Sequence, residues 1–541
     1  MASNRGPVSY EFGADGNLTS KRGGGGLIAG LTSGLAAVGT GDQLTWICAA
    51  LSDADRAAAR QQDGAGVNGS PELPVCMLDI PQHIFEGAYN SVANAALWFV
   101  HHMLFDTPNQ PQFGLAFRQD WDAYVLYNQA FADALAVQAG HRPVPPGGVR
   151  ALIQDYHLAL APRMLRDRAD GRSPGLRIAH FSHTPWAPPA YYQMLPDEAG
   201  RAVLDGMLGA DHVGFLCDRW AAAFLDCCQA FLGADVDLAD PVAPLDPLDP
   251  PDPLDSLNPP TCASGTAGTL ARVSYRDHVT EVAVHPLGVD APALRARAQA
   301  DDVRAHIETL GRAAAGRRLI VRVDRTELSK NIVRGLAAYR ELLVTRPEWR
   351  GRVVHLAFAY PSRSAVPEYR AYTDRMQRLA RQISEEFGTA DWNPLILEVK
   401  DDYPRSLAAC ALADVLLVNP IRDGMNLVAQ EGPVLSERGC ALVLSREAGA
   451  ASTLGADALI VNPYDISETA AALHEALLMP DAERQRRSAA LAATAASWPP
   501  ARWLGDQLAS LAPLTPPAPR TGRCATAGSA GITLPVRPKF L

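Results

Sequence analysis

Short apolar segments rich in β-branched residues alternate along the chain with longer segments whose apolar residues repeat at helical spacing. The apolar segments cover residues 149–154, 176–181, 211–216, 318–323, 353–359, 395–399, 414–420, 441–445 and 458–463. The helical patterns cover about 291–312, 331–345, 367–387 and 466–478. Strands that alternate with helices form parallel sheets with helices on both faces, so the pattern predicts an α/β fold of doubly wound parallel sheets.

The chain of 541 residues exceeds what one hydrophobic core usually covers, so we expect two core domains. A segment dominated by Pro and Asp, 239–260, interrupts the alternation. Because proline removes backbone donors, this segment is predicted to be a solvated insertion in the first domain. The predicted domains are residues 1–285 and 286–480, and the Pro-, Gly-, Ala- and Thr-rich tail at 512–541 is predicted to be disordered.

Composition and charge narrow the classes of partner. The chain has 48% hydrophobic residues, 20% charged residues and a formal net charge of −10, which opposes attraction to polyanions. We therefore expect neither nucleic acid nor an anionic membrane as a partner, and a phosphate ligand must meet a local cationic site.

The cysteines and the N-terminal segment indicate the compartment. The nine cysteines form no CxxC pair and have no histidines at zinc-ligand spacing, so they are predicted to be reduced thiols. The N-terminus carries no basic-then-apolar leader, and no run of about 18 apolar residues occurs. These features predict a cytoplasmic protein.

A glycine-rich turn, 22-RGGGGL-27, precedes a helical pattern at 27–38. Glycines before a helix let backbone N–H groups approach a phosphate or a sugar, and the helix N-terminus adds partial positive charge. A simple surface turn explains an isolated glycine run equally well.

Aromatic and polar residues near two predicted elements are candidates for a sugar site. Segment 89–102 places Tyr89 and Trp98 on a predicted helix, where core packing is the usual alternative. The strand at 149–154 is followed by Asp-Tyr-His, and open α/β sheets bind ligands at the carboxyl ends of strands. His157 is therefore a candidate partner of sugar hydroxyls, although a single histidine is more often structural.

Charged residues follow two later strands. Arg325 and Lys330 lie on the loop between the strand that begins at 318 and the next helix, where two cations suit a diphosphate leaving group. A solvated surface pair is the alternative. Asp423 lies on the loop after the strand at 414–420, and Glu431 is expected about two turns into the following helix, so both carboxylates can face one site. They would bind hydroxyls or support an oxocarbenium-like centre, with a helix N-cap and a surface glutamate as the alternatives.

These segments together resemble the trehalose-6-phosphate synthases of glycosyltransferase family 20, in order from Ser3 to about Trp503. The resemblance is carried by SNRGPV (3–8), RGGGGL (22–27), YNSVANAALW (89–98), WDAYVLYN (121–128), QDYHL (154–158), HFSHTPW (180–186), DHVGFL (211–216), RTELSKN (325–331), AYPSR (359–363), RDGMNLVAQE (422–431) and ALIVNPYD (458–465). It implies the GT-B architecture, in which two Rossmann-like domains face each other across a cleft. It also implies a C-terminal helix within 481–511 that crosses back to the first domain, and 498-WPPARWLGDQL-508 is similar to that element.

The resemblance assigns roles by position. The residues that match the phosphate site for glucose 6-phosphate are Arg5, Tyr89, Trp98 and Arg363. Gly25 and Gly26 match a loop that closes over donor and acceptor. Arg325 and Lys330 match the clamp on the donor diphosphate, and His157 and Asp423 match contacts to the donor glucose. The run that meets the donor sugar and diphosphate corresponds to Gly424, Met425, Asn426 and Leu427, and Glu431 matches the acid that holds the ribose.

The resemblance also implies a reaction. Glucose would move from a nucleoside-diphosphate glucose to glucose 6-phosphate with retention at the anomeric carbon, giving α,α-trehalose 6-phosphate, without a metal or another cofactor. The alternatives are a related enzyme with another phosphorylated or pseudo-sugar acceptor, and a catalytically silent sugar-phosphate-binding subunit. The silent class would be expected to lose the site charges. The sequence does not identify the donor base, and self-association into a homo-oligomer is left open.

Three departures from the family pattern stand out. The family has apolar residues before SNRGP that form a first strand, whereas this sequence begins Met1-Ala2-Ser3. Either the start is placed too late or the first central strand is lacking. Gln154 stands where His is common, and Asn331 stands where Gly is common.

Overall fold

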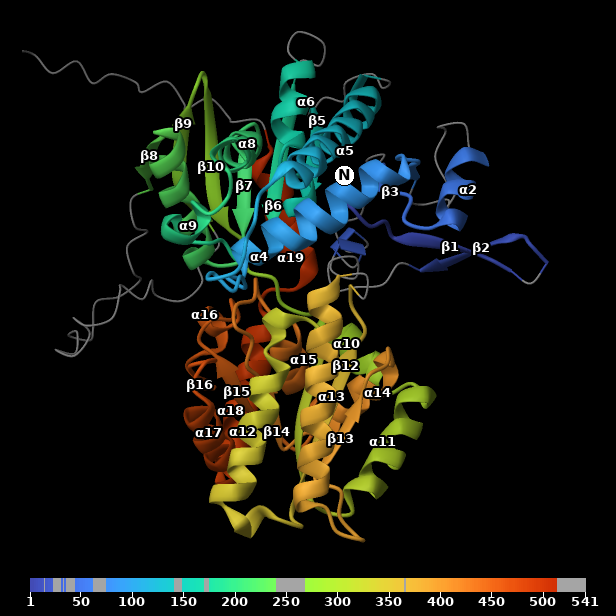
Figure 1. Ribbon diagram of the computed structural model, residues 1–541, viewed down its shortest axis with the longest axis vertical. Helices are drawn as coiled ribbons and strands as arrows, with labels where there is room; N and C mark the ends of the chain where they lie inside the picture. The colour runs from blue at the N-terminus through green and yellow to red at the C-terminus, as the bar shows by residue number, and fades with distance from the viewer. Residues whose placement is uncertain are drawn as a thin grey trace, which may run out of the picture.

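The computed structural model describes residues 1–13, 15–22, 31–32, 34–35, 44–61, 74–140, 148–169, 175–239, 268–363 and 366–512. Gly25 and Gly26, the insertion from residue 240 and the tail from residue 513 lie outside these ranges. The described chain forms two lobes, each built on its own sheet (Figure 1). The first lobe contains the described residues up to Val284, and the second contains those from Ala291 to Ala496.

The sheet of the second lobe is entirely parallel, as the alternating pattern predicts. Its strands lie in the order β13 (Leu395–Glu398), β12 (Val353–Tyr360), β11 (Arg318–Arg325), β14 (Val415–Val418), β15 (Ala441–Ser445), β16 (Leu459–Val461). Numbered within the lobe, this is the order 3-2-1-4-5-6 of a doubly wound sheet. The strand order reverses between β11 and β14, so ligands are expected at the carboxyl ends of these two strands.

The sheet of the first lobe is mixed, which corrects the expectation of a purely parallel sheet. Its strands lie in the order β5 (Val149–Gln154), β6 (Leu176–Ser182), β7 (His212–Phe215), β10 (His278–Val284), β9 (Gly268–Tyr275), β8 (Asp235–Leu238). Strand β9 is antiparallel to both neighbours. Only Arg276 and Asp277 connect β9 to β10, and a link of two residues can join only antiparallel strands.

The N-terminal residues continue this sheet beyond β5. Ala2 bridges Ile153 of β5 on one side and Ile47 of β3 (Trp46–Ala49) on the other, both in parallel register. Its N–H donates to the Leu152 carbonyl at 2.8 Å, and β3 pairs in turn with β4 (Val75–Leu78). Ala2 therefore joins β5 to β3 through a single bridged residue at the position between them.

The first lobe also carries the hairpin of β1 (Val8–Phe12) and β2 (Leu18–Arg22), which projects from the side of the molecule (Figure 1).

Helices cover both sheets, beginning with that of the first lobe. Its helices are α2 (Asp53–Gln61), α3 (Gln82–Phe85), the π-helix η1 (Glu86–Leu97), α4 (Trp98–His101), α5 (Leu115–Gly140), η2 (Tyr156–Leu158), α6 (Ala161–Ala169), α7 (Pro189–Tyr192), α8 (Asp197–Met207), α9 (Asp218–Cys227) and η3 (Cys228–Leu232).

The second lobe has helices close to the predicted ranges. They are α10 (Ala291–Ala298), α11 (Asp301–Ala314), η5 (Leu328–Lys330), α12 (Ile332–Thr345), η6 (Pro347–Trp349), α13 (Pro367–Phe387), α14 (Tyr403–Leu412), α15 (Val428–Leu435), α16 (Ala451–Leu454), α17 (Ile466–Leu478) and α18 (Asp481–Ala496). The single pattern expected at 291–312 is two helices, and α11 begins at Asp301 and Asp302, whose charges favour a helix N-terminus.

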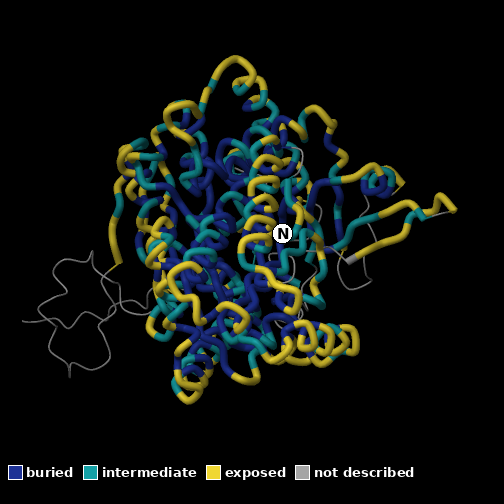
Figure 2. Tube along the Cα trace, turned by 60° about the horizontal axis from the view of Figure 1, so that its bottom comes forward, coloured by how far each residue is buried: buried dark blue, intermediate teal, exposed yellow. Residues whose placement is uncertain are grey.

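The last helix, α19 (Pro500–Ser510), returns from the second lobe and lies against the first (Figure 1). Trp503 on this helix is 1% exposed and meets the Phe181 ring of β6 edge-on, with ring centroids 5.1 Å apart. Buried residues lie in the interior of the molecule and exposed residues lie at its periphery (Figure 2). Packing of α19 therefore ties the end of the described chain to the first sheet.

Trp503→Ala should lower the free energy of unfolding by about 3–5 kcal/mol, because it leaves a cavity against Phe181. Urea-induced unfolding followed by circular dichroism measures this loss. Asp506→Ala on the same helix is the control and should stay within about 0.5 kcal/mol of wild type. Equal losses in the two variants would contradict a packing role for Trp503.

Candidate active site

The carboxyl ends of β11 and β14 bring two loops into contact. Arg325 is the last residue of β11, Lys330 lies in η5, and Asp423 follows β14. The Lys330 ammonium lies 2.5 Å from the Asp423 carboxylate, so the predicted cationic loop and the predicted acidic loop meet. The Arg325 side chain is 51% exposed, which leaves its guanidinium accessible to a ligand.

The loop after Asp423 packs tightly against the first lobe. A side chain at Gly424 would bring its Cβ within 1.9 Å of the His183 carbonyl oxygen, so only glycine fits. The Gly424 carbonyl accepts a hydrogen bond from the Trp220 indole at 2.9 Å. Asn426 has a positive φ of 76° and donates from its side chain to Asp423 at 3.0 Å. The backbone therefore lies close against the first lobe at Gly424, and the next residue, Met425, is buried.

Glu431 lies in the first turn of α15, because that helix begins at Val428. This corrects the expectation that Glu431 lies about two turns into the helix. Burial raises the pKa of its carboxyl to about 7. Burial also raises the pKa values of Tyr360 and Tyr403, and Glu431 adds to both shifts, so the carboxylate and two tyrosines share one neighbourhood.

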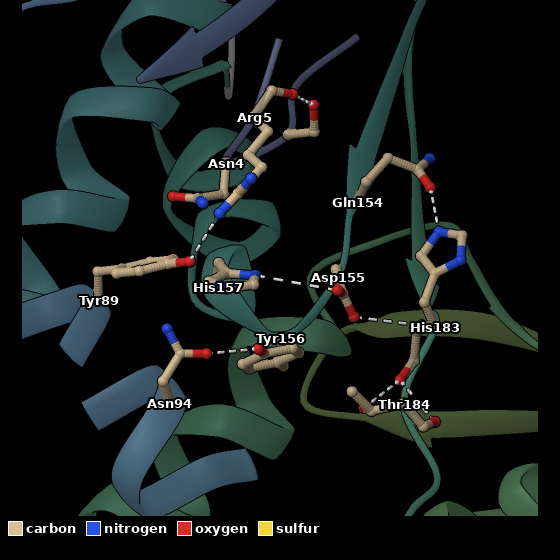
Figure 3. A network of polar contacts seen from close by, with 12 residues as sticks. Asn4, Arg5, Tyr89, Asn94, Gln154, Asp155, Tyr156, His157, His183 and Thr184 are labelled. Atoms are coloured by element: carbon tan, nitrogen blue, oxygen red, sulfur yellow. Dashed lines mark hydrogen bonds and ion pairs between the residues drawn. The ribbon is translucent and has the colours of Figure 1, made fainter. Parts of the chain in front are cut away.

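On the first lobe, Arg5 and Tyr89 form a polar contact above a stack of rings (Figure 3). The Arg5 guanidinium donates to the Tyr89 hydroxyl at 3.5 Å, and the Tyr89 ring stacks on His157 with centroids 5.5 Å apart. Burial favours the neutral phenol, but Arg5 and Arg363 outweigh it and lower the pKa of Tyr89. Residues from three distant segments of the sequence therefore share one electrostatic environment.

Arg363 of the second lobe reaches into this environment. Its guanidinium lies over the Trp98 ring at 4.0 Å and donates to the hydroxyls of Tyr369 at 2.7 Å and Tyr156 at 3.3 Å. The structure thus brings the four predicted acceptor-site residues together, with cations from both lobes. Among the described residues, the hydrogen bonds of the Arg363 guanidinium go to neutral phenol groups. These partners do not neutralise its positive charge, which can therefore act on a ligand.

His157 is held as a neutral ring. It lies in η2, shortly after the end of β5, and its ring lies tilted against that of Tyr156 with centroids 4.0 Å apart. Burial, together with Arg363 and Arg5, holds its pKa well below the usual range. At neutral pH His157 can therefore exchange hydrogen bonds with a hydroxyl but carries no charge.

Two neighbours that the sequence reasoning did not select lie at the same place (Figure 3). Asp155 adopts φ 74° and ψ 168°, a strained conformation for a residue other than glycine, and accepts a hydrogen bond from the His183 backbone at 3.2 Å. Burial raises the pKa of Asp155 to about 6. The His183 ring shares a 2.9 Å hydrogen bond with Gln154. The sequence could have identified Asp155 and His183 as site residues, because they directly follow β5 and β6 and the carboxyl ends of strands in open sheets bind ligands.

Asn331, one of the departures from the family pattern, has a structural explanation. It adopts the left-handed conformation, with φ 57° and ψ 34°. Glycine adopts this conformation without strain, and asparagine tolerates it better than most residues. Its side chain also donates to the carbonyls of Asn419 at 3.0 Å and Pro463 at 2.7 Å, so asparagine fixes the turn after Lys330.

Comparison with known proteins places the chain in a family. The model of the family described as Glycosyltransferase family 20 matches residues 1–512. The chain belongs to glycosyltransferase family 20.

Individual relatives are similar over most of the family-20 chain. A bifunctional trehalose-6-phosphate synthase/phosphatase of Thermoproteus tenax is 30% identical over 495 residues, which cover 90% of this chain and 60% of that protein. The chain therefore spans less than two thirds of the length of this relative.

Solved structures share the fold. An α,α-trehalose-phosphate synthase (UDP-forming) from Burkholderia xenovorans in complex with glucose-6-phosphate has a TM-score of 0.73 at 25% identity, covering 90% of this chain and 96% of that one. A structure described as trehalose-6-phosphate from E. coli bound with UDP-2-fluoro glucose has a TM-score of 0.75 at 25% identity, covering 94% and 98%. The predicted GT-B architecture of two Rossmann-like lobes is confirmed.

Metal sites and membrane spans are absent from the described residues of the family-20 chain. Within the described ranges, no group of three or more His, Cys, Asp or Glu side chains is arranged to hold a metal ion. No helix in the part of the chain that the structure describes is both long and apolar enough to span a bilayer. The expectation that the reaction needs no metal stays a prediction.

Proposed function

We propose that this family-20 chain transfers glucose from a nucleoside-diphosphate glucose to glucose 6-phosphate, giving α,α-trehalose 6-phosphate and the nucleoside diphosphate. One observation carries the proposal: two cationic groups lie in one region, and Arg363 links the lobes there. One group, Arg5 and Arg363, is flanked by aromatic rings, and the other, Arg325 and Lys330, lies where the second sheet reverses its strand order. Two phosphorylated substrates match two such groups.

For the acceptor, we propose that the phosphate of glucose 6-phosphate binds Arg5 and Arg363. Guanidinium groups bind phosphate oxygens in pairs, and the Trp98 ring holds Arg363 in place from behind. The Tyr89 hydroxyl, which already contacts Arg5, would complete the site. The similar Burkholderia xenovorans enzyme was solved in complex with glucose-6-phosphate, which supports the choice of ligand.

For the donor, we propose that Arg325 and Lys330 bind the diphosphate. Lys330 pairs with Asp423. A bound donor would accept hydrogen bonds from Lys330 through its diphosphate oxygens and donate to Asp423 through its glucose hydroxyls. Glu431 would accept hydrogen bonds from the ribose, since carboxylates accept from vicinal hydroxyls. His157, as a neutral ring, would bond a sugar hydroxyl.

The proposed chemistry takes place on one face of the donor glucose. The bond between the anomeric carbon and the diphosphate oxygen breaks, and the negative charge that develops on the diphosphate is stabilised by Arg325 and Lys330. The acceptor hydroxyl gives its proton to the departing diphosphate oxygen and forms the new bond on the same face. Configuration is thereby retained without a protein nucleophile, because binding fixes the two reactants in register.

Glu431 makes donor binding dependent on pH. With a pKa of about 7 it is neutral below that pH and ionised above it, and ribose hydroxyls donate to the ionised form. The KM for the donor should therefore rise about tenfold between pH 8 and pH 6. Steady-state kinetics at fixed glucose 6-phosphate measure this change. Glu431→Gln should flatten the profile, and an unchanged pH dependence in that variant would contradict the role of Glu431.

A panel of donors tests the proposed function. UDP-, GDP- and ADP-glucose are each incubated with the purified protein and glucose 6-phosphate, and nucleotide release and product mass are recorded. We expect one donor to give a product with the mass of a disaccharide monophosphate. The silent-subunit alternative predicts no release with any donor, although it conflicts with the presence of Arg325, Lys330, Asp423 and Glu431.

A further inference from the structure

A buried carboxylate lies between the cations of the two proposed phosphate sites. Glu327 follows β11, and its side chain is 0% exposed. Its Oε1 lies 3.0 Å from the Arg325 guanidinium and accepts a hydrogen bond from the Ser362 hydroxyl at 2.9 Å. Ser362 precedes Arg363 in the segment after β12, so one oxygen atom contacts the donor-site cation and the segment that carries the acceptor-site cation.

The second oxygen of this carboxylate is unusual. Oε2 is buried, and it has no hydrogen-bond partner among the described residues. A buried acceptor without a partner is costly and is rarely found where only stability is required. An anionic group is also unexpected at a site for two phosphates, because it repels both.

Three cations keep Glu327 ionised. Burial favours the neutral acid, but Arg325, Arg363 and Lys330 together with Ser362 outweigh it and lower the pKa of Glu327 to about 2. The effect is reciprocal for Arg363: burial alone would lower its pKa, but Glu327 and nearby tyrosines raise it. The carboxylate is therefore charged at any pH near neutrality and acts on both phosphate sites.

We propose that Glu327 is a positioning residue that holds the Arg325 guanidinium and the segment Ser362–Arg363 at a fixed separation, so that donor diphosphate and acceptor are bound in register. This inference rests on the proposed function and names a residue through which its two phosphate sites are coupled. The carboxylate also reduces the mutual repulsion of Arg325, Lys330 and Arg363 before substrates bind. Its benefit therefore lies in geometry at the transition state rather than in affinity for phosphate.

The variant Glu327→Gln distinguishes an effect on the positions of the two reactants from an effect on nucleotide affinity. The amide keeps the size of the side chain and can accept from Ser362, but it loses the ion pair with Arg325. Because a misplaced reactant slows chemistry, kcat should fall about 100-fold. Removal of a negative charge near the phosphates should leave the Kd for UDP within about threefold of wild type or make it tighter. Glu327→Asp, which keeps the charge but shortens the reach, should lower kcat about tenfold.

Kinetics with glucose 6-phosphate and the donor that the panel selects, and calorimetry with the nucleoside diphosphate of that donor (UDP where it is UDP-glucose), give the two readouts. Glu386→Gln, which breaks the ion pair between Glu386 on α13 and Arg340 on α12, is the matched control and should behave as wild type. A kcat within about threefold of wild type in Glu327→Gln, or a loss of UDP affinity equal to the loss of kcat, would overturn the inference. A purely structural role would produce the second of these results.

Ser362→Ala provides a second test if Glu327→Gln fails to fold. It removes one hydrogen bond to the ionised carboxylate and should lower kcat about tenfold with unchanged UDP binding, because a hydrogen bond to a charged group contributes about 1.5 kcal/mol. An unchanged kcat would overturn the inference. Failure of the proposed function would appear in the wild-type protein, which would form no product, whereas failure of this inference would appear only in variants of an active wild type.

Discussion

Arg325→Ala should lower kcat by about 100- to 1000-fold, because the variant loses a cation placed where negative charge develops on the leaving diphosphate. The side chain is half-exposed, and its only ion pair in the described chain is with Glu327, which keeps Ser362, Arg363 and Lys330 as neighbours. We therefore expect the variant to fold. Nucleotide release under saturating substrates gives kcat, and circular dichroism reports the fold.

The control for this variant is Arg340→Ala. Arg340 also pairs with a glutamate in the second lobe, at 2.6 Å from Glu386, but on the outer surface. The kcat of Arg340→Ala should equal that of wild type. Near-normal turnover in Arg325→Ala would contradict departure of the diphosphate toward Arg325.

Arg363→Ala should raise the KM for glucose 6-phosphate about 100-fold, since charged hydrogen bonds to phosphate contribute more than neutral ones. Arg363→Lys keeps the charge but loses the planar group that lies over Trp98 and bonds Tyr369 and Tyr156. It should therefore recover only part of the loss. Saturation curves at fixed donor concentration measure both variants.

The matched control is Arg352→Ala, because Arg352 also lies over a tryptophan ring, that of Trp349, at 5.7 Å in the same lobe. It should leave both KM values unchanged. The assignment of Arg363 to the acceptor would be contradicted if its variants raised the KM of the donor and spared that of glucose 6-phosphate.

The second lobe was predictable from the sequence because each of its strands is an apolar run, and the helical patterns at 331–345, 367–387 and 466–478 correspond to α12, α13 and α17. Helix α13 has the predicted bounds, 367–387, since its apolar residues repeat over more than five turns. The first lobe was less predictable. Strands β3 and β4 have four residues each, too few for a periodic signal, and their pairing depends on Ala2, which is far away in the sequence. The π-helix η1 is likewise set by packing rather than by local propensity.

The candidate site was predictable where one continuous motif carries it, as for Arg325 and Lys330 on the loop after β11. It was not predictable where burial or strain decides the chemistry. The positive φ of Asp155 and the burial of Glu327 depend on contacts between segments that the sequence does not place together. The contacts of Arg363 with Trp98 and Tyr156 were not predictable for the same reason, because they join the two lobes.

The anomeric configuration of the product tests the central claim most directly. The purified full chain is incubated with glucose 6-phosphate and the donor that the panel selects, and the product is followed by proton nuclear magnetic resonance. We predict a disaccharide phosphate in which both anomeric carbons are α, formed in equal amount with the released nucleoside diphosphate. A β-linked product, or nucleotide release without a new disaccharide, would contradict the proposed transfer.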